Sequence, residues 1–325
     1  MTTTRAQFSA AFIAAISTLC AITAGAQTWP DKAVRIIVPF AAGGPADVYA
    51  RVLGQKLQET LGHTFLIENR PGGGAIVGTE AAAKSPADGY TLLMMSNTHT
   101  VNESLFRNKP YQLMRDFVPV APINYSDLVL VVHPSVPART LKELLDLARA
   151  KPKLLNYASS GPGTPYHMAG ELFKAMAGVD IIHVPYKGSA GARTDVMGGQ
   201  VELMFDAVTT MAPMVRNGQL IAIGTTGTAR SPVLPNVPTV AEAGVPGYEA
   251  TIWLGIMAPA GTPKAIVDKL NAEIGKITSS ASINEAWGKQ GATSMNMSPD
   301  EFGRYLRADI EKWSKIVMIS GATVD

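Results

Sequence analysis

Two glycine loops in this sequence carry residue types that can bind an anion. The first precedes an expected helix and consists of Phe40, Ala41, Ala42, Gly43 and Gly44. Glycine lets the backbone approach a ligand closely, and the unpaired N–H groups and dipole at a helix start favour a negative charge. The same pattern also fits a tight strand-to-helix turn that binds nothing. The sequence of this loop is therefore compatible with anion binding but does not require it.

The second loop has the same position in a later part of the chain and adds hydroxyl groups. It contains Ser159, Ser160, Gly163 and Thr164, and its three hydroxyl side chains can donate hydrogen bonds to an anion. Thr164 also fits a helix N-cap, because Pro165 follows it at the first helical position. Taken singly, capping is the more common role. Two such loops facing each other across a cleft would supply several donors to one carboxylate.

Other polar and aromatic side chains could complete such a site. Asp206 ends an apolar strand, where its carboxylate could contact a ligand or cap the following turn. His167 lies in the first turn of a helix, and we favour a structural hydrogen-bonding role for it over direct ligand contact. Tyr186 and Trp253 could form walls of the cleft, although aromatic residues at strand ends more often belong to the core.

Motifs of several other protein classes are missing from the sequence. Gly72, Gly73 and Gly74 lack the Lys-Ser/Thr of a phosphate-binding loop, and the stretch has no dinucleotide fingerprint. No G-x-S-x-G is present, so a hydrolase would have to use Ser160 with His167. The five histidines are at least sixteen residues apart, which gives no metal-ligand spacing. We therefore expect no cofactor and no metal.

The composition is that of an ordinary globular protein. The chain has 325 residues, of which 46% are hydrophobic and 17% charged, and one or two domains are expected. The formal net charge is +2, and the sequence contains no run of five like charges. The sequence thus lacks the cluster of basic residues that nucleic-acid-binding proteins use, so we expect no nucleic-acid partner.

The N-terminal segment indicates secretion. Arg5 is the only charged residue before Asp31, and an apolar run over residues 10–23 ends in an alanine-x-alanine cleavage signature. We predict a cleavable signal peptide over residues 1–26; the alternative, a membrane anchor, would need an apolar run of roughly 20 residues. Cys20 is the only cysteine, and Leu19 before it argues against lipoprotein processing. The mature chain would then contain no thiol for catalysis or metal binding.

The apolar patterns predict an α/β fold of two similar halves. Strand-like runs alternate with helical periodicity, which indicates a mostly parallel sheet covered by helices. The order restarts after a proline-punctuated segment at 118–123, and a chain that passes twice between two halves forms a cleft. We expect strands at 33–40, 64–68, 90–95, 128–133, 155–158, 181–184, 203–207, 220–225 and 253–258, and helices at 47–61, 76–84, 141–149, 166–177, 265–278 and 299–320.

Six segments in register resemble the Bug family of periplasmic receptors that serve tripartite tricarboxylate transporters. They are WPDKAVRIIVPFAAGGPADVYAR, ENRPGGGAIVGTEAAAKSPADGYTLLM, YASSGPGTPYHMAGELF, HVPYKG, GGQVELMFD and WLGIMAPAGTP. The resemblance covers essentially the whole mature chain. It implies a type II periplasmic-binding-protein fold, with residues 27–126 and 252–325 in one domain and residues 127–251 in the other.

The resemblance also implies how a ligand is held. Family members bind ligand carboxylates largely through backbone amides and ordered water. The resemblance implies that residues 40–44 and 159–164 bind the carboxylate in this chain. Asp206 matches a strand-end position that some members use to discriminate between ligands. Ala46 departs from the family, in which threonine is frequent at this position, so the resemblance does not carry over a hydroxyl contact from this residue.

Our leading hypothesis is an extracytoplasmic receptor rather than an enzyme. It would capture a small mono- or dicarboxylate, aliphatic or aromatic, by domain closure in the periplasm and deliver it to permease subunits of a tripartite tricarboxylate-type transporter. We expect it to act as a monomer. The alternatives are a receptor that feeds a signalling partner and a hydrolase. Ligand specificity would reside in the variable walls of the cleft, at Ser96, Thr98, Tyr186, Asp206 and Trp253.

Overall fold

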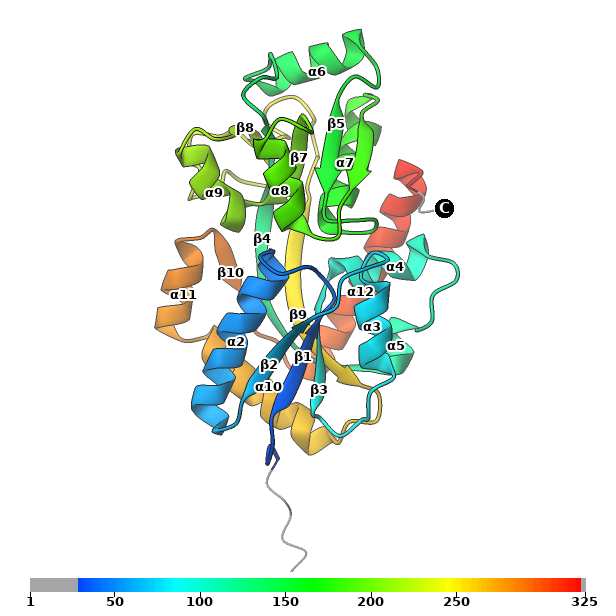
Figure 1. Cartoon of the computed structure of the whole chain (residues 1–325), viewed down its shortest axis with the longest axis vertical. Helices are drawn as coiled ribbons and strands as arrows, with labels where there is room; N and C mark the ends of the chain where they lie inside the picture. The colour runs from blue at the N-terminus through cyan, green and yellow to red at the C-terminus, as the bar shows by residue number, and fades with distance from the viewer. Residues whose placement is uncertain (1–28, 323–325) are drawn as a thin grey trace, which may run out of the picture. The chain divides into compact units, whose positions relative to one another are not determined.

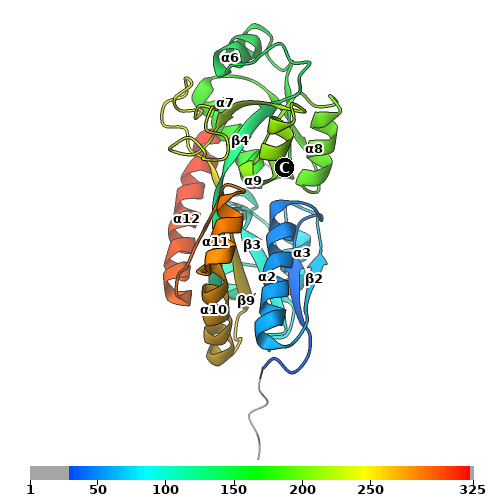
Figure 2. The same cartoon turned by 90° about the vertical axis from the view of Figure 1, so that its left-hand side faces the viewer.

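Runs of aliphatic and β-branched residues form the strands of one sheet in residues 29–322, the part of the chain that the computed structural model describes. From Ala33 onward, helices pack on both faces of this sheet (Figures 1 and 2). The strands are β1 (Val34–Val38), β2 (Phe65–Asn69), β3 (Thr91–Ser96), β4 (Phe117–Val132), β5 (Asn156–Ser159), β6 (Ile182–Pro185), β7 (Leu203–Ala207), β8 (Ile221–Thr225), β9 (Thr251–Pro259) and β10 (Ala292–Ser294).

The helices connect these strands and also form the C-terminal part of the chain. They are α2 (Pro45–Leu61), α3 (Ile76–Ala83), α4 (Asn97–Leu105), α5 (Leu113–Asp116), α6 (Leu141–Ala150), α7 (Pro165–Ala177), α8 (Ser189–Met197), α9 (Val208–Arg216), α10 (Lys264–Thr278), α11 (Ala281–Gly288) and α12 (Pro299–Ser320). Across residues 29–322, none of them is long and apolar enough to cross a membrane. The predicted signal peptide and Cys20 lie outside the described residues.

The sheet has parallel strands at both ends and antiparallel strands in the middle. Its order is β2-β1-β3-β9-β4-β7-β5-β6, with β10 and β8 also paired to β4. Strand β1 runs parallel to β2 and β3, and β5 runs parallel to β6 and β7. Strands β4 and β9 pair antiparallel to each other and to their other neighbours. The expectation of a mostly parallel sheet therefore holds for the two ends only.

Strand β4 passes from one half of the sheet to the other. Residues 117–127 pair with β9, whereas residues 128–132 pair with β7 and β8. We call the half with β1, β2, β3, β9 and β10 lobe A and the half with β5, β6, β7 and β8 lobe B (Figure 1). The chain returns to lobe A at Thr251, where β9 begins. The predicted domain boundaries fall close to these two passages, and the division into domains itself stays a prediction.

The proline-punctuated segment at 118–123, for which no strand was predicted, is part of β4. The sequence analysis starts the strand at Leu128, but the structure starts it at Phe117. The register with β9 shifts between Pro119 and Ala121 and again between Pro122 and Asn124. Proline cannot donate a hydrogen bond to the ladder, so it is tolerated in a strand next to such irregularities.

Each lobe has its own hydrophobic core, and α12 packs against both lobes. In lobe A, Trp253, Phe302 and Leu306 are among the buried residues of one cluster. A separate cluster joins Val101 of α4 in lobe A to Met168 of α7 and Trp313 of α12. Figure 2 shows α12 running alongside both lobes. This helix therefore forms part of the connection between them.

Four helices begin directly after a strand or a short loop, on the side where the lobes meet. These are α2 after β1, α4 after β3, α7 after β5 and α8 after β6. Of the four, α4 and α8 are missing from the sequence predictions, because their residues are mostly small or polar and lack an apolar stripe. A capping box stabilises the start of α4: Ser96 accepts a hydrogen bond from the amide of Thr98, and His99 accepts one from the amide of Ser96.

Candidate functional site

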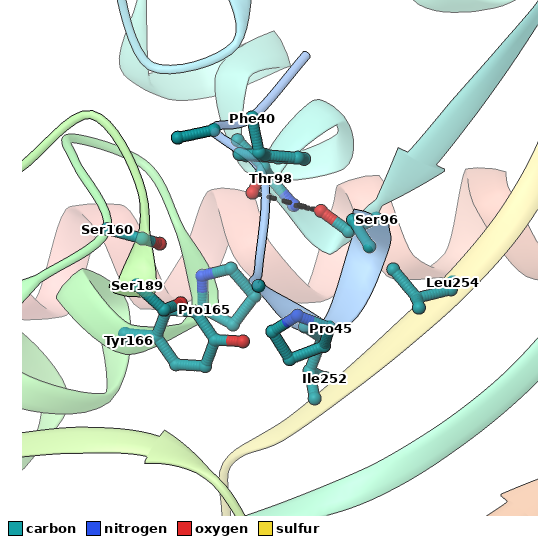
Figure 3. A pocket seen from close by; sticks show the side chains of 13 residues that line it. Phe40, Pro45, Ser96, Thr98, Ser160, Pro165, Tyr166, Ser189, Ile252 and Leu254 are labelled. Carbon is teal, nitrogen blue, oxygen red and sulfur yellow. Dashed lines mark hydrogen bonds between the residues drawn. The ribbon is translucent and has the colours of Figure 1, made fainter. Parts of the chain in front are cut away.

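The first turns of these four helices line one cavity between the lobes. Its empty volume is about 330 Å³. Figure 3 shows side chains from both lobes converging on it. The lining residues are Phe40, Ala41, Gly44, Pro45, Ala46, Ser96, Thr98, Ser160, Pro165, Tyr166, Ser189, Ile252 and Leu254.

Helix ends supply the electrostatic field of this cavity. No acidic or basic side chain is among its lining residues. The N-terminus of a helix carries about half a positive elementary charge, together with N–H groups that have no partner within the helix. Four such ends meet here, from α2, α4, α7 and α8. The cavity is therefore suited to a negatively charged group.

The first glycine loop keeps only some of its amide groups available. The amide of Gly43 donates to Oδ2 of Asp47 (3.0 Å), and the amide of Ala41 donates to the carbonyl of Lys187 in lobe B (3.3 Å). The amides of Ala42, Gly44 and Ala46 have no hydrogen-bond partner among residues 29–322. Of the predicted contacts in this loop, Phe40, Ala41 and Gly44 line the cavity, whereas Ala42 and Gly43 do not.

Asp47 holds the first loop in place. Its carboxylate accepts hydrogen bonds from Nε of Arg51 (3.1 Å) and from Nη2 of the same residue (2.8 Å), in addition to the Gly43 amide. Burial opposes ionisation of Asp47, but the hydrogen bonds from Arg51 and Gly43 outweigh it and lower the pKa of the carboxyl group. The amide of Gly43 therefore stabilises the turn and is not available to a ligand.

In the second glycine loop, only Ser160 lines the cavity. The hydroxyl of Ser159 lies 2.6 Å from Nε2 of His183 and accepts the amide of Gly161 (3.1 Å). Thr164 caps α7: its hydroxyl donates to the carbonyl of Gly161 (2.7 Å) and accepts the amide of His167 (3.4 Å). Ser159, Gly163 and Thr164 therefore fix the shape of the loop while Ser160 faces inward (Figure 3).

His167 belongs to a buried aromatic stack behind the second loop. Its ring packs on His183 at a centroid distance of 4.1 Å, and His183 packs on Tyr157 at 4.9 Å. Nδ1 of His167 accepts the amide of Gly163 (3.2 Å). Burial lowers the pKa of His167 to about 4 and that of His183 to about 3, so both are neutral at pH 7. Within the described part of the chain, no hydrogen bond joins His167 to Ser160, as a hydrolase would need.

Thr98 presents a hydroxyl group to the cavity from the start of α4. The Ser96 hydroxyl donates to Oγ1 of Thr98 (3.0 Å) and accepts the Thr98 amide (3.2 Å). Because Oγ1 of Thr98 already accepts a hydrogen bond, its own proton can be donated to a group in the cavity. Thr98 and Ser160 thus offer one hydroxyl from each lobe (Figure 3).

Arg193 bridges the two lobes. Its guanidinium is buried, donates from Nη2 to the carbonyl of Gly43 in lobe A (2.7 Å) and lies 3.8 Å from Oδ2 of Asp206 in lobe B. Together with the hydrogen bond between Ala41 and Lys187, this contact joins the first glycine loop of lobe A to lobe B. Sequence reasoning did not identify Arg193, because its burial cannot be read from a helix without an apolar stripe.

Asp206 is fully buried next to the cavity and does not line it. Its Oδ1 accepts the amide of Ala207 (2.8 Å), whereas its Oδ2 has no hydrogen-bond partner among the described residues. Burial raises the pKa of Asp206 to about 6, and the charge of Arg193 together with hydrogen-bonding groups limits the rise. The carboxyl group therefore titrates close to neutral pH.

Two aromatic residues predicted at the cleft do not line this cavity. The Trp253 indole packs against Phe302 and Tyr305 in the core of lobe A and donates to Oδ2 of Asp309 (3.2 Å). Side chains alternate along a strand, so its neighbours in β9 face the cavity instead: Ile252 and Leu254. Tyr186 donates to Oδ2 of Asp195 (2.6 Å) and lines a second cavity, which shares Phe40 and Ser160 with the first.

Sequence reasoning missed several lining residues. Pro45 and Pro165 occupy the first position of α2 and α7, and Tyr166 and Ser189 lie in the first turns of α7 and α8. A proline directly before a helical pattern marks a helix start, so the rule that ligands lie at strand ends could have found the two prolines. Nothing in the local sequence distinguishes Tyr166 from a core tyrosine.

Comparison with known proteins places these features in one family. Residues 49–321 match the model of the tripartite tricarboxylate transporter family receptor, TctC. BugT of Bordetella pertussis is 38% identical over 299 residues, which cover 91% of this chain and 92% of that protein. A protein of Pseudomonas sp. (strain P51), described as a UPF0065 protein in the tcbD-tcbE intergenic region, is 38% identical over 90% of this chain and 87% of its own length.

Solved structures share the fold and two of them contain organic acids. An R. palustris protein with adipate is 36% identical, with a TM-score of 0.88 over 91% of this chain and 100% of that chain. MatC from Rhodopseudomonas palustris with bound malate is 31% identical, with a TM-score of 0.85 over 89% of this chain and 100% of that chain. A third structure, of the periplasmic binding protein BugD, is 31% identical, with a TM-score of 0.87 over 91% of this chain and 99% of that chain. The family and the fold are those of binding proteins rather than enzymes, which confirms the predicted fold class. The chain belongs to the tripartite tricarboxylate transporter receptor family, which includes the Bug proteins.

Proposed function

We propose that this protein captures the carboxylate of a small organic acid in the cavity between its lobes and delivers the acid to permease subunits of a tripartite tricarboxylate-type transporter. The observation that carries the proposal is the meeting of four helix N-termini in a cavity without charged side chains. Such ends favour an anion through their dipoles and their unpaired N–H groups. The predicted signal peptide would send the mature protein to the periplasm.

The donors for the carboxylate come from both lobes. Lobe A offers the hydroxyl of Thr98 and the unpaired amides of Gly44 and Ala46, and lobe B offers the hydroxyl of Ser160. Hydrogen bonds to an ionised acceptor are roughly twice as strong as those between neutral groups. A carboxylate bound by both sets of donors would therefore stabilise the closed arrangement over the open one.

The remaining walls suit the hydrocarbon part of an organic acid. Phe40, Pro45, Ile252 and Leu254 place apolar surface around the cavity (Figure 3). Two relatives with this fold were solved with adipate and malate, both of them small carboxylates.

A thermal-shift screen tests the proposed function. We expect at least one small carboxylic acid to raise the melting temperature, because a ligand that binds only the native state adds to its apparent stability. Neutral sugars and simple amines serve as controls and are expected to produce no shift. A shift caused by sugars or amines, with none from any carboxylate, would exclude the carboxylate receptor.

A further inference from the structure

The cavity has a second polar region, on the side of lobe B away from Thr98. The Tyr166 ring extends from α7 toward Pro45, with its hydroxyl at the cavity (Figure 3). This hydroxyl is buried and has no hydrogen-bond partner among the described residues. Leaving a buried hydroxyl unpaired is costly, and such groups in native proteins usually have a partner. A ligand is the partner that this cavity can supply.

Asp206 determines what kind of partner Tyr166 requires. The hydroxyls of Tyr166 and Ser189 both lie near enough to the Asp206 carboxylate to favour its ionised form, although Oδ2 of Asp206 has no hydrogen bond of standard geometry. A carboxylate only accepts hydrogen bonds, so the ionised Asp206 favours orientations in which these two hydroxyl protons point toward it, although the Tyr166 hydroxyl does not reach hydrogen-bonding geometry with it. The oxygen lone pairs of Tyr166 and Ser189 are then available to the cavity. The group that completes this region must therefore donate a hydrogen bond.

Arg193 determines the charge of that donor. Its guanidinium lies 3.8 Å from Oδ2 of Asp206 and is itself buried, so it compensates the negative charge of the carboxylate. A ligand ammonium group would be repelled by Arg193 and attracted by Asp206, so its net electrostatic gain would be small. A second carboxylate carries no proton to donate at neutral pH. A hydroxyl group has a proton to donate and carries no charge, so it fits next to both Asp206 and Arg193.

From this geometry we infer that Tyr166 and Ser189 form a subsite for a hydroxyl group, which makes a hydroxylated carboxylate the preferred ligand class. The inference rests on the proposed function, because the carboxylate of the same molecule occupies the helix N-termini. A site built to bond a hydroxyl discriminates against the analogue without it, since the polar groups of the site are then left unpaired.

Matched acids test the subsite by calorimetric titration. Three sets are compared. The first is propionate with lactate and alanine, the second is succinate with malate, and the third is benzoate with para-hydroxybenzoate. For at least one set, we expect the hydroxylated acid to bind about tenfold more tightly than the parent acid, the size expected for one added hydrogen bond. Tyr166→Phe removes the hydroxyl and keeps the ring, so it is expected to abolish this preference, and Ser189→Ala is expected to reduce the preference. Tyr248→Phe is the control, because Tyr248 is also buried in lobe B but donates to the carbonyl of Ala169 (2.7 Å).

The outcomes separate this inference from the proposed function. If parent acids bind but no hydroxylated acid binds more tightly, or if the preference persists in Tyr166→Phe, the hydroxyl subsite is wrong and the carboxylate receptor stands. Tighter binding of alanine than of lactate would also overturn the subsite, because it would show a site for ammonium. If no carboxylate binds to the wild type, the proposed function fails and the subsite fails with it.

Discussion

Replacing Gly44 with valine is expected to weaken carboxylate binding by at least about 100-fold, which corresponds to about 2.7 kcal/mol. Gly44 precedes α2 with extended backbone angles, φ −87° and ψ 170°, which valine adopts without strain. A Cβ at this position would lie 3.7 Å from Oγ of Ser189 and 3.9 Å from the carbonyl oxygen of Ala41. The two methyl groups of valine extend beyond this Cβ into the cavity, where they cover the amides at the start of α2.

Calorimetric titration of Gly44→Val with an acid from the thermal-shift screen measures this effect. Gly44→Ala adds only the Cβ, which makes ordinary contacts, and is expected to bind more tightly than the valine variant. Gly288→Val is the control for the residue change, because a Cβ on Gly288 meets nothing within 4 Å. All three variants should melt close to the wild type. Undiminished affinity in Gly44→Val would remove the first glycine loop from the binding site.

Replacing Asp206 with asparagine is expected to change how the stability of the fold depends on pH. The folded pKa of about 6 is raised from an ordinary value of 3.8, chiefly by burial. The stability that this group contributes is therefore present below pH 3.8 and is lost as the pH rises through 6. The rise corresponds to about 3 kcal/mol in all, of which about 2 kcal/mol falls between pH 4 and pH 7. Asparagine does not titrate, so the stability of the variant does not fall with pH through this group.

Denaturant unfolding of both proteins at several pH values measures the difference. The free energy of unfolding of the wild type minus that of Asp206→Asn is expected to fall by about 2 kcal/mol from pH 4 to pH 7. The subtraction is necessary because the neutral, buried rings of His99, His167 and His183 have lowered pKa values and act in the opposite direction. Asp180→Asn, at a half-exposed aspartate, is the control. A constant difference between wild type and Asp206→Asn would show that Asp206 ionises as it does in water.

Strong periodicity made most of the fold predictable. The alternation of apolar strands and amphipathic helices in residues 33–95 matches β1, α2, β2, α3 and β3 within two residues at every boundary. Helices α4 and α8 could not be predicted in this way, since neither has an apolar stripe. A capping box stabilises the start of α4, whereas α8 has no side-chain cap and packs against β5 and β7. The start of β4 was missed because Pro119 and Pro122 indicate a break, whereas irregular pairing with β9 accommodates them.

The candidate site was predictable to the level of its loops but not of its atoms. The rule that ligands lie at strand ends led to Phe40, Ala41, Gly44 and Ser160, which line the cavity. The hydroxyl of Thr164 has the chemistry to bind an anion or to cap a helix, and the three-dimensional position shows that it caps α7. Residues that act across the lobes, such as Arg193, have no local signature, because their partners are distant in the sequence.

A comparison of one carboxylic acid with its primary amide tests the central claim most directly. The two molecules have nearly the same shape, and only the acid carries a negative charge at pH 7. If four helix N-termini hold the ligand through its charge, calorimetric titration should show binding of the acid and at least about 100-fold weaker binding of the amide. Equal affinities for the acid and the amide would contradict a carboxylate site at the helix N-termini.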